Sequence, residues 1–258
     1  MRQYIEVVGI SSVEEAHCVV EHYHNARPIG SEIILRLGIV AKPNLVGVQR
    51  DEQITHAVCN QCLCWSDVDV CMHWYDQTGA PTDLMAVVTG TYAVAGFNLS
   101  HLQLDIPELP DPGLLGTAVH ATRSNGLRVV LSLGCNQLLD NGYDSDEPDY
   151  GPLIERLSEY ATDGYVDQLV IKPGWLGNKV NLRLLIQAVR ELYPRWGVTI
   201  FDGLVLPTAI GEVRELAMEF GGVSVSAHHQ LFACPGGPEL SETRVLCFIQ
   251  EGLRVLGT

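Results

Sequence analysis

Short runs of β-branched and aliphatic residues alternate along the chain with longer segments whose apolar residues recur at helical spacing. The eight runs predict strands at 4–10, 32–40, 70–76, 101–106, 127–134, 166–173, 198–205 and 222–229. Strands that alternate with helices favour a parallel sheet joined by crossover helices. Eight such units in 258 residues are the size of one closed barrel. We therefore predict the α/β class and a single (β/α)8 TIM-barrel domain over residues 1–258, with a parallel eight-stranded core.

The segments between the strands carry helix signals. Ser12 and Glu15 form a capping box at the start of the first helix, and Pro238 precedes the last one. The apolar stripes are Ala16, Val19, Val20 and Tyr23 in the first helix, Leu182, Leu185, Ile186, Val189 and Leu192 after the sixth strand, and Leu246, Ile249, Leu253 and Leu256 at the end. The segment 41–69 is less regular, because 46–49 (VGVQ) fits a strand and 51–65 fits a helix.

Polar side chains share one face of the predicted strands. Alternate residues of a barrel strand point toward the helices or toward the axis, and the polar face belongs on the axis because the helix-covered side is apolar. Barrel interiors are usually filled by Val, Ile and Leu, so a polar axis indicates a site, with an internal hydrogen-bond network as the alternative. The axis-facing residues are Glu6, Val8, Arg36, His73, Tyr75, His101, Gln103, Asp105, Ser132, Lys172, Asp202, Ser224, Ser226 and His228.

Composition narrows the range of partners. The formal net charge is −15, from 16 basic and 31 acidic residues, and it repels nucleic acid and anionic membranes. No apolar run reaches the roughly 18 residues of a membrane span. Most of the eight cysteines lie in apolar runs, and the first residues, MRQYIEVVGI, lack a signal-peptide pattern. We expect a cytoplasmic protein without nucleic-acid or membrane partners, of undetermined oligomeric state.

Motifs along most of the chain resemble those of one barrel family. They are VVGISSVEEA (7–16), HLQLD (101–105), KPGWLGNKVNLRLL (172–185), FDGL (201–204) and VSVSAHHQLFACPGGPE (223–239). They resemble the Cys-Gly-Ile-Thr opening, the Gln-Leu-His-Gly strand and the glycine-bearing loops of phosphoribosylanthranilate isomerase, a ribulose-phosphate-binding barrel. The resemblance implies the fold predicted above, a small substrate and phosphate contacts from the last two loops, where Gly203 and Ser226 match but Asp202 and Ala227 replace glycines.

The catalytic positions of that family are replaced in this chain. Val8 stands at the position of the general-base cysteine, Lys172 at that of the general-acid aspartate, and Glu6 at that of a lysine. The Amadori rearrangement needs one group to take a proton from carbon and another to protonate the ring oxygen. Valine can do neither, so we do not expect the parent isomerisation by the parent residues.

A second resemblance is to ribulose-phosphate 3-epimerase, through IKPGWLGNKV (171–180) and DVCMHW (69–74). In that family a third-strand histidine and a seventh-strand aspartate bind a divalent metal, and they correspond to His73 and Asp202. The remaining His-x-Asp ligands correspond to Arg36-Leu-Gly38, which cannot replace them. With two ligands matched, we predict no metal and no cofactor.

Lys172 is the most informative candidate, because it ends the sixth predicted strand, where class I aldolases of this architecture carry a Schiff-base lysine. The alternatives are pairing with a carboxylate or an anionic ligand, and a solvent-facing side chain.

We predict an isomerase or lyase that acts by proton transfer on a small polar carbonyl or sugar, free or phosphorylated. Lys172 would activate the carbonyl while Asp105, Asp202 or His228 moves protons. The predicted substrate-binding residues are Glu6, Arg36, His73, Tyr75, Gly174, Gly177, Gly203 and Ser226. The rival functions are a non-catalytic barrel that binds a metabolite or protein, and an aldolase using Lys172.

Two further clusters have alternative interpretations. Cys59, Cys62 and Cys64 could hold zinc, but a structural zinc site needs a second pair of ligands. The alternation of strand residues places the nearby Cys71 and His73 inside the barrel instead. We therefore favour reduced cysteines that pack as small hydrophobic side chains. The acidic loop 140–151 could bind Ca²⁺, yet its spacing is not that of an EF-hand, so we favour a solvated loop or lid. Its relevant residues are Asp144, Asp146, Asp149, Tyr143 and Tyr150.

Overall fold

The structure is a computed structural model of the whole chain. It describes residues 3–10, 12–41, 56–62, 64–75, 99–105, 113, 116–117, 120, 128–133, 145–162, 168–171, 179–192, 197–203, 215–216, 218–220, 223–230, 247, 249–250, 252–254 and 256. The short strand considered for 46–49 lies outside these residues.

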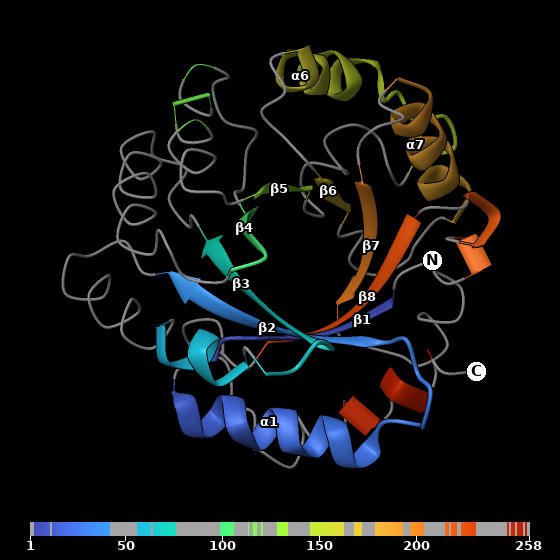
Figure 1. Cartoon of the computed structure of the whole chain (residues 1–258). Helices are drawn as coiled ribbons and strands as arrows, with labels where there is room; N and C mark the ends of the chain where they lie inside the picture. Colours follow the sequence, from blue (N-terminus) through green and yellow to red (C-terminus); the bar gives the residue numbers. More distant parts are fainter. Residues whose placement is uncertain are drawn as a thin grey trace.

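Parallel strands pair in sequence order around a closed barrel (Figure 1). They are β1 (Gln3–Val8), β2 (Ile34–Ala41), β3 (Val68–Tyr75), β4 (His101–Asp105), β5 (Arg128–Leu133), β6 (Gln168–Ile171), β7 (Gly197–Gly203) and β8 (Val223–Gln230). Each strand is hydrogen-bonded to the next, and β8 pairs with β1, with Glu6 opposite His228. The predicted α/β class with parallel strands is confirmed.

Each predicted strand overlaps an observed one, and the differences lie at the ends. The first strand ends at Val8 rather than at Ile10, because Gly9 has φ 101° and turns the chain out of the strand. The N–H groups of Gly9 and Ile10 both donate to the Gly38 carbonyl, at 2.8 and 3.2 Å. The third strand begins at Val68, two residues before the predicted start.

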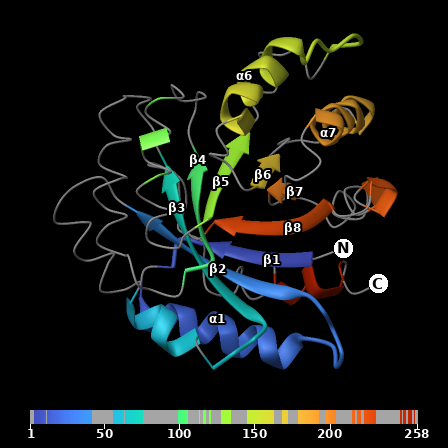
Figure 2. The same cartoon turned by 45° about the horizontal axis from the view of Figure 1, so that its top comes forward.

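The labelled helices lie on the outside of the barrel, α1 (Val13–Ala26) beneath β1 and β2, and α6 (Gly151–Thr162) and α7 (Lys179–Leu192) on the opposite side (Figures 1 and 2). Their apolar faces and the outer faces of the strands form one core. The predicted stripes are buried at Ala16, Val19, Val20, Tyr23, Leu182, Leu185, Ile186, Val189, Ile249, Leu253 and Leu256. The helical segment at 56–62 lies within the helix predicted for 51–65.

The start and the underside of α1 are fixed by specific contacts. The backbone N–H of Glu15 donates to Ser12 Oγ at 3.1 Å, as the capping box predicts. The buried Tyr23 hydroxyl donates to the Ile33 carbonyl at 2.5 Å, and burial raises its pKa to about 12. Helix α1 is therefore joined by a hydrogen bond to the residue just before β2.

The end of the acidic loop is part of the packed structure. Asp149 Oδ1 accepts a hydrogen bond from the Gly151 N–H at 2.9 Å and so caps α6. Tyr150 is buried, and its hydroxyl donates to the Asn181 carbonyl of α7 at 3.1 Å. A tyrosine held in this way does not serve as a moving lid residue. Asp144 and Tyr143 lie outside the described residues.

In the part of the chain that the structure describes, no helix combines the length and the apolar character that crossing a bilayer requires.

Candidate functional site

Buried polar side chains line the inside of the barrel. The described buried polar residues on strands are Glu6, Arg36, His73, His101, Gln103 and Ser132. Each alternates with residues of the helix-facing core, as Glu6 does with Ile5 and Val7. The strand period therefore placed these side chains on the correct face.

Glu6 and His73 meet although their strands are not neighbours. His73 Nε2 lies 2.6 Å from Glu6 Oε1, and the two side chains are 0% and 1% exposed. Strand β2 runs between them, and its Gly38 pairs in register with Val8 of β1 and with Cys71 of β3. A Cβ atom built on Gly38 would lie 2.9 Å from both His73 Cδ2 and Val8 Cγ2. The missing side chain at Gly38 is what lets the His73 ring reach the carboxylate of Glu6.

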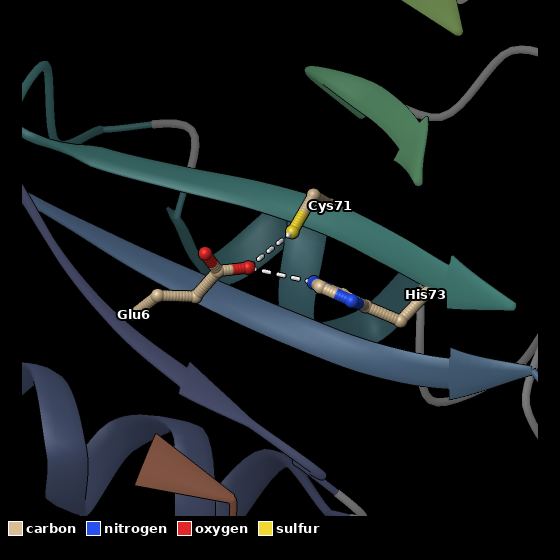
Figure 3. A group of neighbouring side chains, drawn as sticks. All are labelled: Glu6, Cys71 and His73. Atoms are coloured by element: carbon tan, nitrogen blue, oxygen red, sulfur yellow. Dashed lines mark hydrogen bonds and ion pairs between the residues drawn. The ribbon is translucent and has the colours of Figure 1, made fainter. Parts of the chain in front are cut away.

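Cys71 completes a buried group of three side chains. It precedes His73 by two residues on β3, so the two point to the same side. The Cys71 thiol donates to Glu6 Oε1 at 3.6 Å, and the donor atoms of all three residues lie within 4.8 Å of one another (Figure 3). Burial raises the pKa of the Cys71 thiol, and the neighbouring His73 offsets this only in part. We name Glu6, Cys71 and His73 the interior triad.

Arg36 supplies positive charge on the N-terminal side of the triad. It pairs in register with Glu6, its guanidinium carbon lies 4.0 Å from the Tyr4 ring centroid, and Nη2 lies 3.7 Å from Asp69 Oδ2. Burial is the largest single effect on Arg36 and by itself would lower its pKa, but the combined effect of its neighbours, Glu6 foremost and Asp69 among them, outweighs burial and the pKa is raised. Arg36 therefore stays charged inside the barrel and balances Glu6.

His101 borders the same interior from β4. It is 2% exposed, and its Nδ1 lies 2.8 Å from Ser100 Oγ. Burial and the charge of Arg36 lower the pKa of His101 well below its usual value, so the ring is neutral. Within the described residues its Nε2 atom has no hydrogen-bond partner, and the same holds for Nε of Arg36. A polar interior built only for packing would satisfy such atoms.

The other predicted site residues are placed only in part. Tyr75 and Asp105 are the last residues of β3 and β4 and pair in register, and Asp202 and Gly203 end β7 beside Ala227 and His228. The carboxyl ends of these strands thus gather at one end of the barrel, with Ser226 on β8. The side chains of Tyr75, Asp105, Asp202, Ser226 and His228 are outside what the structure describes. Lys172, Gly174 and Gly177 lie outside the described residues altogether.

Sequence reasoning missed three contributors to the interior site. It placed Cys71 inside the barrel but did not predict its contact with Glu6, and it considered Gly38 only as a residue that replaces a metal ligand. It also left out Asp69, which pairs with Arg36. The sequence signal for Cys71 was its two-residue spacing from His73, which puts both on the axis-facing side of β3, together with the axis-facing position of Glu6 two strands away.

The cysteines of the 59–64 segment lie elsewhere. Cys59 and Cys62 line a cavity of about 270 Å³ between the helical segment 56–62 and the N-terminal ends of β3 and β4, with Asp69 and Trp65 also in its wall. Burial raises the pKa of Cys59 to about 12 and that of Cys62 to about 11. Among the described residues, the interior triad is the one group of three metal-ligand side chains.

These thiols should differ sharply in reactivity. Cys64 is exposed, whereas Cys59 and Cys62 are buried with raised pKa values, and only the thiolate is alkylated. We expect iodoacetamide at pH 8 to modify Cys64 within minutes and to leave Cys59 and Cys62 unmodified until the protein is unfolded in urea. Fragment-ion mass spectrometry of the peptide that contains all three measures this. Equal rates at the three positions in the folded protein would contradict the packing described.

The closed barrel of parallel strands is the fold of the TIM-barrel enzymes. No protein-family model matches the chain, and no curated protein matches its sequence. Among solved structures, phosphoribosyl anthranilate isomerase from Thermococcus kodakaraensis is 11% identical with a TM-score of 0.53, and the match covers 98% of this chain and 97% of that one.

Two other solved structures are similar over comparable lengths. D-psicose 3-epimerase from Clostridium cellulolyticum H10 is 10% identical with a TM-score of 0.52, covering 100% of this chain and 97% of that one. Active domain 2 of a chitinase from Pyrococcus furiosus is 10% identical with a TM-score of 0.61, covering 100% and 96%. Identities this low establish the fold alone.

Proposed function

We propose that the chain is a single (β/α)8 barrel over residues 1–258 and a cytoplasmic enzyme of the isomerase or lyase kind. It acts by proton transfer on a small polar carbonyl or sugar, free or phosphorylated, and is related to the phosphoribosylanthranilate isomerases with their catalytic positions replaced. We expect no nucleic-acid partner, because the net charge of −15 repels nucleic acid.

The observation that carries the proposal is the buried polar interior. Placing a carboxylate, a guanidinium and two imidazoles inside a barrel costs stability that Val, Ile and Leu would not cost. The unsatisfied Nε2 of His101 and Nε of Arg36, among the described residues, argue against a closed packing network. A site that receives polar groups of a substrate explains both features.

The proposed site residues fall into two groups, one at the carboxyl ends of the strands and one deeper in the barrel. Lys172, Asp105, Asp202 and His228 belong to the carboxyl ends of the strands, where barrel enzymes carry their reactive groups. Lys172 binds or activates the carbonyl, and the other three move protons. Tyr75, Gly174, Gly177, Gly203 and Ser226 would contact the substrate from the same end. His73 and Glu6 form the floor of the site, and Arg36, engaged by Tyr4 and Asp69, balances the charge of Glu6 from the neighbouring strand.

Proton exchange with solvent tests this proposal across several substrate classes at once. The full chain is incubated in D₂O with aldoses, ketoses and 2-oxo acids, each free and phosphorylated, and proton NMR follows the C–H beside the carbonyl. We expect one class to exchange, and both Lys172→Ala and Asp202→Asn to slow the exchange by about 100-fold or more, the usual contribution of general acid–base groups. Lys179→Ala, at the first residue of α7, is the matched lysine control and should exchange normally.

The rival from another class is a barrel that binds a metabolite without converting it. A compound that raises the melting temperature but is recovered without deuterium, with Lys172→Ala changing only its affinity, would establish the binding barrel and overturn the enzyme. The Schiff-base variant is distinguished by borohydride: trapping of the carbonyl compound on Lys172, located by peptide mass mapping, supports an aldolase.

A further inference from the structure

We propose that the interior triad binds one divalent zinc-class ion, with Glu6 Oε, Cys71 Sγ and His73 Nε2 as its three protein ligands. The site is inside the barrel rather than at the cysteine-rich segment 59–64. Ion binding by the triad stands independently of the proposed function, and only the role of the ion toward a carbonyl substrate rests on it.

The spacing of the donor atoms suits a tetrahedral ion. Ligands at about 2.0 to 2.3 Å from zinc lie about 3.3 to 3.7 Å from one another. Cys71 Sγ and Glu6 Oε1 are already 3.6 Å apart. His73 Nε2 and Glu6 Oε1, at 2.6 Å, must separate by less than an ångström, which a small rotation of the Glu6 side chain provides. All three donor atoms lie within 4.8 Å of one another, from two strands that do not pair directly.

The chemistry of the donors selects the kind of ion. A thiolate, an imidazole and a carboxylate together suit Zn²⁺ or Co²⁺ rather than Mg²⁺ or Ca²⁺, which prefer oxygen ligands. The ion would also compensate the cost of burying Glu6 and the Cys71 thiolate, which forms when the ion replaces the thiol proton. Arg36, in register with Glu6 on β2, stays outside the coordination shell and adds a positive charge beside the carboxylate.

The number of ligands leaves one position open. Structural zinc sites have four protein ligands, whereas catalytic sites have three and a water or substrate atom. Among the described residues, Nε2 of the buried His101 has no hydrogen-bond partner, and in this site it would hydrogen-bond the molecule in the fourth position. Under the proposed function, that molecule is the substrate carbonyl, polarised by the ion.

Cobalt binding tests the site directly. The chain, purified without a histidine tag and stripped with EDTA, is titrated with Co²⁺ and followed by absorption. We expect one equivalent to bind and to give a near-ultraviolet thiolate-to-cobalt charge-transfer band. Cys71→Ser should abolish the band and weaken binding by at least about 100-fold, more than the loss of an outer contact. The matched control, Cys59→Ser, removes another buried thiol and should leave the band unchanged.

A measurement on the unaltered chain covers the case in which Cys71→Ser does not fold. X-ray absorption of the zinc-loaded protein should give one sulfur and two or three nitrogen or oxygen ligands. Two or more sulfurs would assign the ion to Cys59, Cys62 and Cys64 and overturn the proposal, as would the absence of a charge-transfer band from the titrated wild type. Because neither measurement uses a substrate, failure of deuterium exchange would count against the proposed function and not against the ion site.

Discussion

Replacing Glu6 by glutamine is expected to destabilise the folded protein by about 3 to 5 kcal/mol, the usual cost of removing one partner from a buried charge pair. Glu6 is the carboxylate that raises the pKa of the buried Arg36, and it also accepts from Cys71 and contacts His73. Without its charge, the guanidinium of Arg36 is left inside the barrel, and the carboxylate that remains beside it among the described residues is that of the partly exposed Asp69. Urea unfolding followed by circular dichroism measures the change.

Two variants make the Glu6 prediction specific. Glu21→Gln makes the same chemical change on the exposed side of α1 and should alter stability by less than about 0.5 kcal/mol. Arg36→Met in the Glu6→Gln background removes the uncompensated charge and should restore part of the loss, because residues of one network do not act additively. Equal effects of Glu6→Gln and Glu21→Gln would show that Glu6 is not buried in a charge network.

Replacing Gly38 by valine is expected to cost about 3 kcal/mol or more, and replacing it by alanine somewhat less. The new Cβ would lie 2.9 Å from His73 Cδ2 and 2.9 Å from Val8 Cγ2, which is closer than real Cβ atoms approach. The His73 ring and the Val8 side chain are enclosed inside the barrel, so neither can move away cheaply. Thermal and urea unfolding measure the loss.

A second substitution distinguishes a specific collision at Gly38 from a general sensitivity of β2 to substitution. Val8→Ala removes one of the two colliding groups, so Gly38→Ala should cost less in that background than in the wild type. Gly38→Ala should also lower the Co²⁺ affinity, because it displaces the His73 ring. A Gly38→Ala protein with wild-type stability and unchanged Co²⁺ binding would contradict the proposed reason why Glu6 and His73 meet.

The strand period predicted much of the fold and the polarity of its interior. The two-residue alternation in β4, with His101 and Gln103 opposite Leu102 and Leu104, assigned the inner and outer faces, and the same parity transferred correctly to Glu6 in β1. This worked because helices cover the outer face and make it uniformly apolar. The end of β1 was missed because the pattern of apolar residues continues through Gly9 to Ile10, while the chain direction changes at the glycine.

The interior triad could not be predicted from pattern alone. Parity places Cys71 and His73 on the same face, but it does not say that Glu6, two strands away, is within contact distance. That contact depends on the absence of a side chain at Gly38 and on the register between β1, β2 and β3. Local pattern does not encode register. The roles of Lys172, Asp105, Asp202 and His228 stay predictions of the sequence.

Anomalous diffraction from crystals grown with zinc tests the central claim of an interior, metal-binding site most directly. Data collected on either side of the zinc absorption edge locate the ion without any assumption about its ligands. We expect one strong peak inside the barrel, bonded to Glu6, Cys71 and His73 with a fourth position open toward the axis. A peak at Cys59 and Cys62, or an interior in which Glu6 and His73 stay hydrogen-bonded with no peak beside them, would contradict the claim.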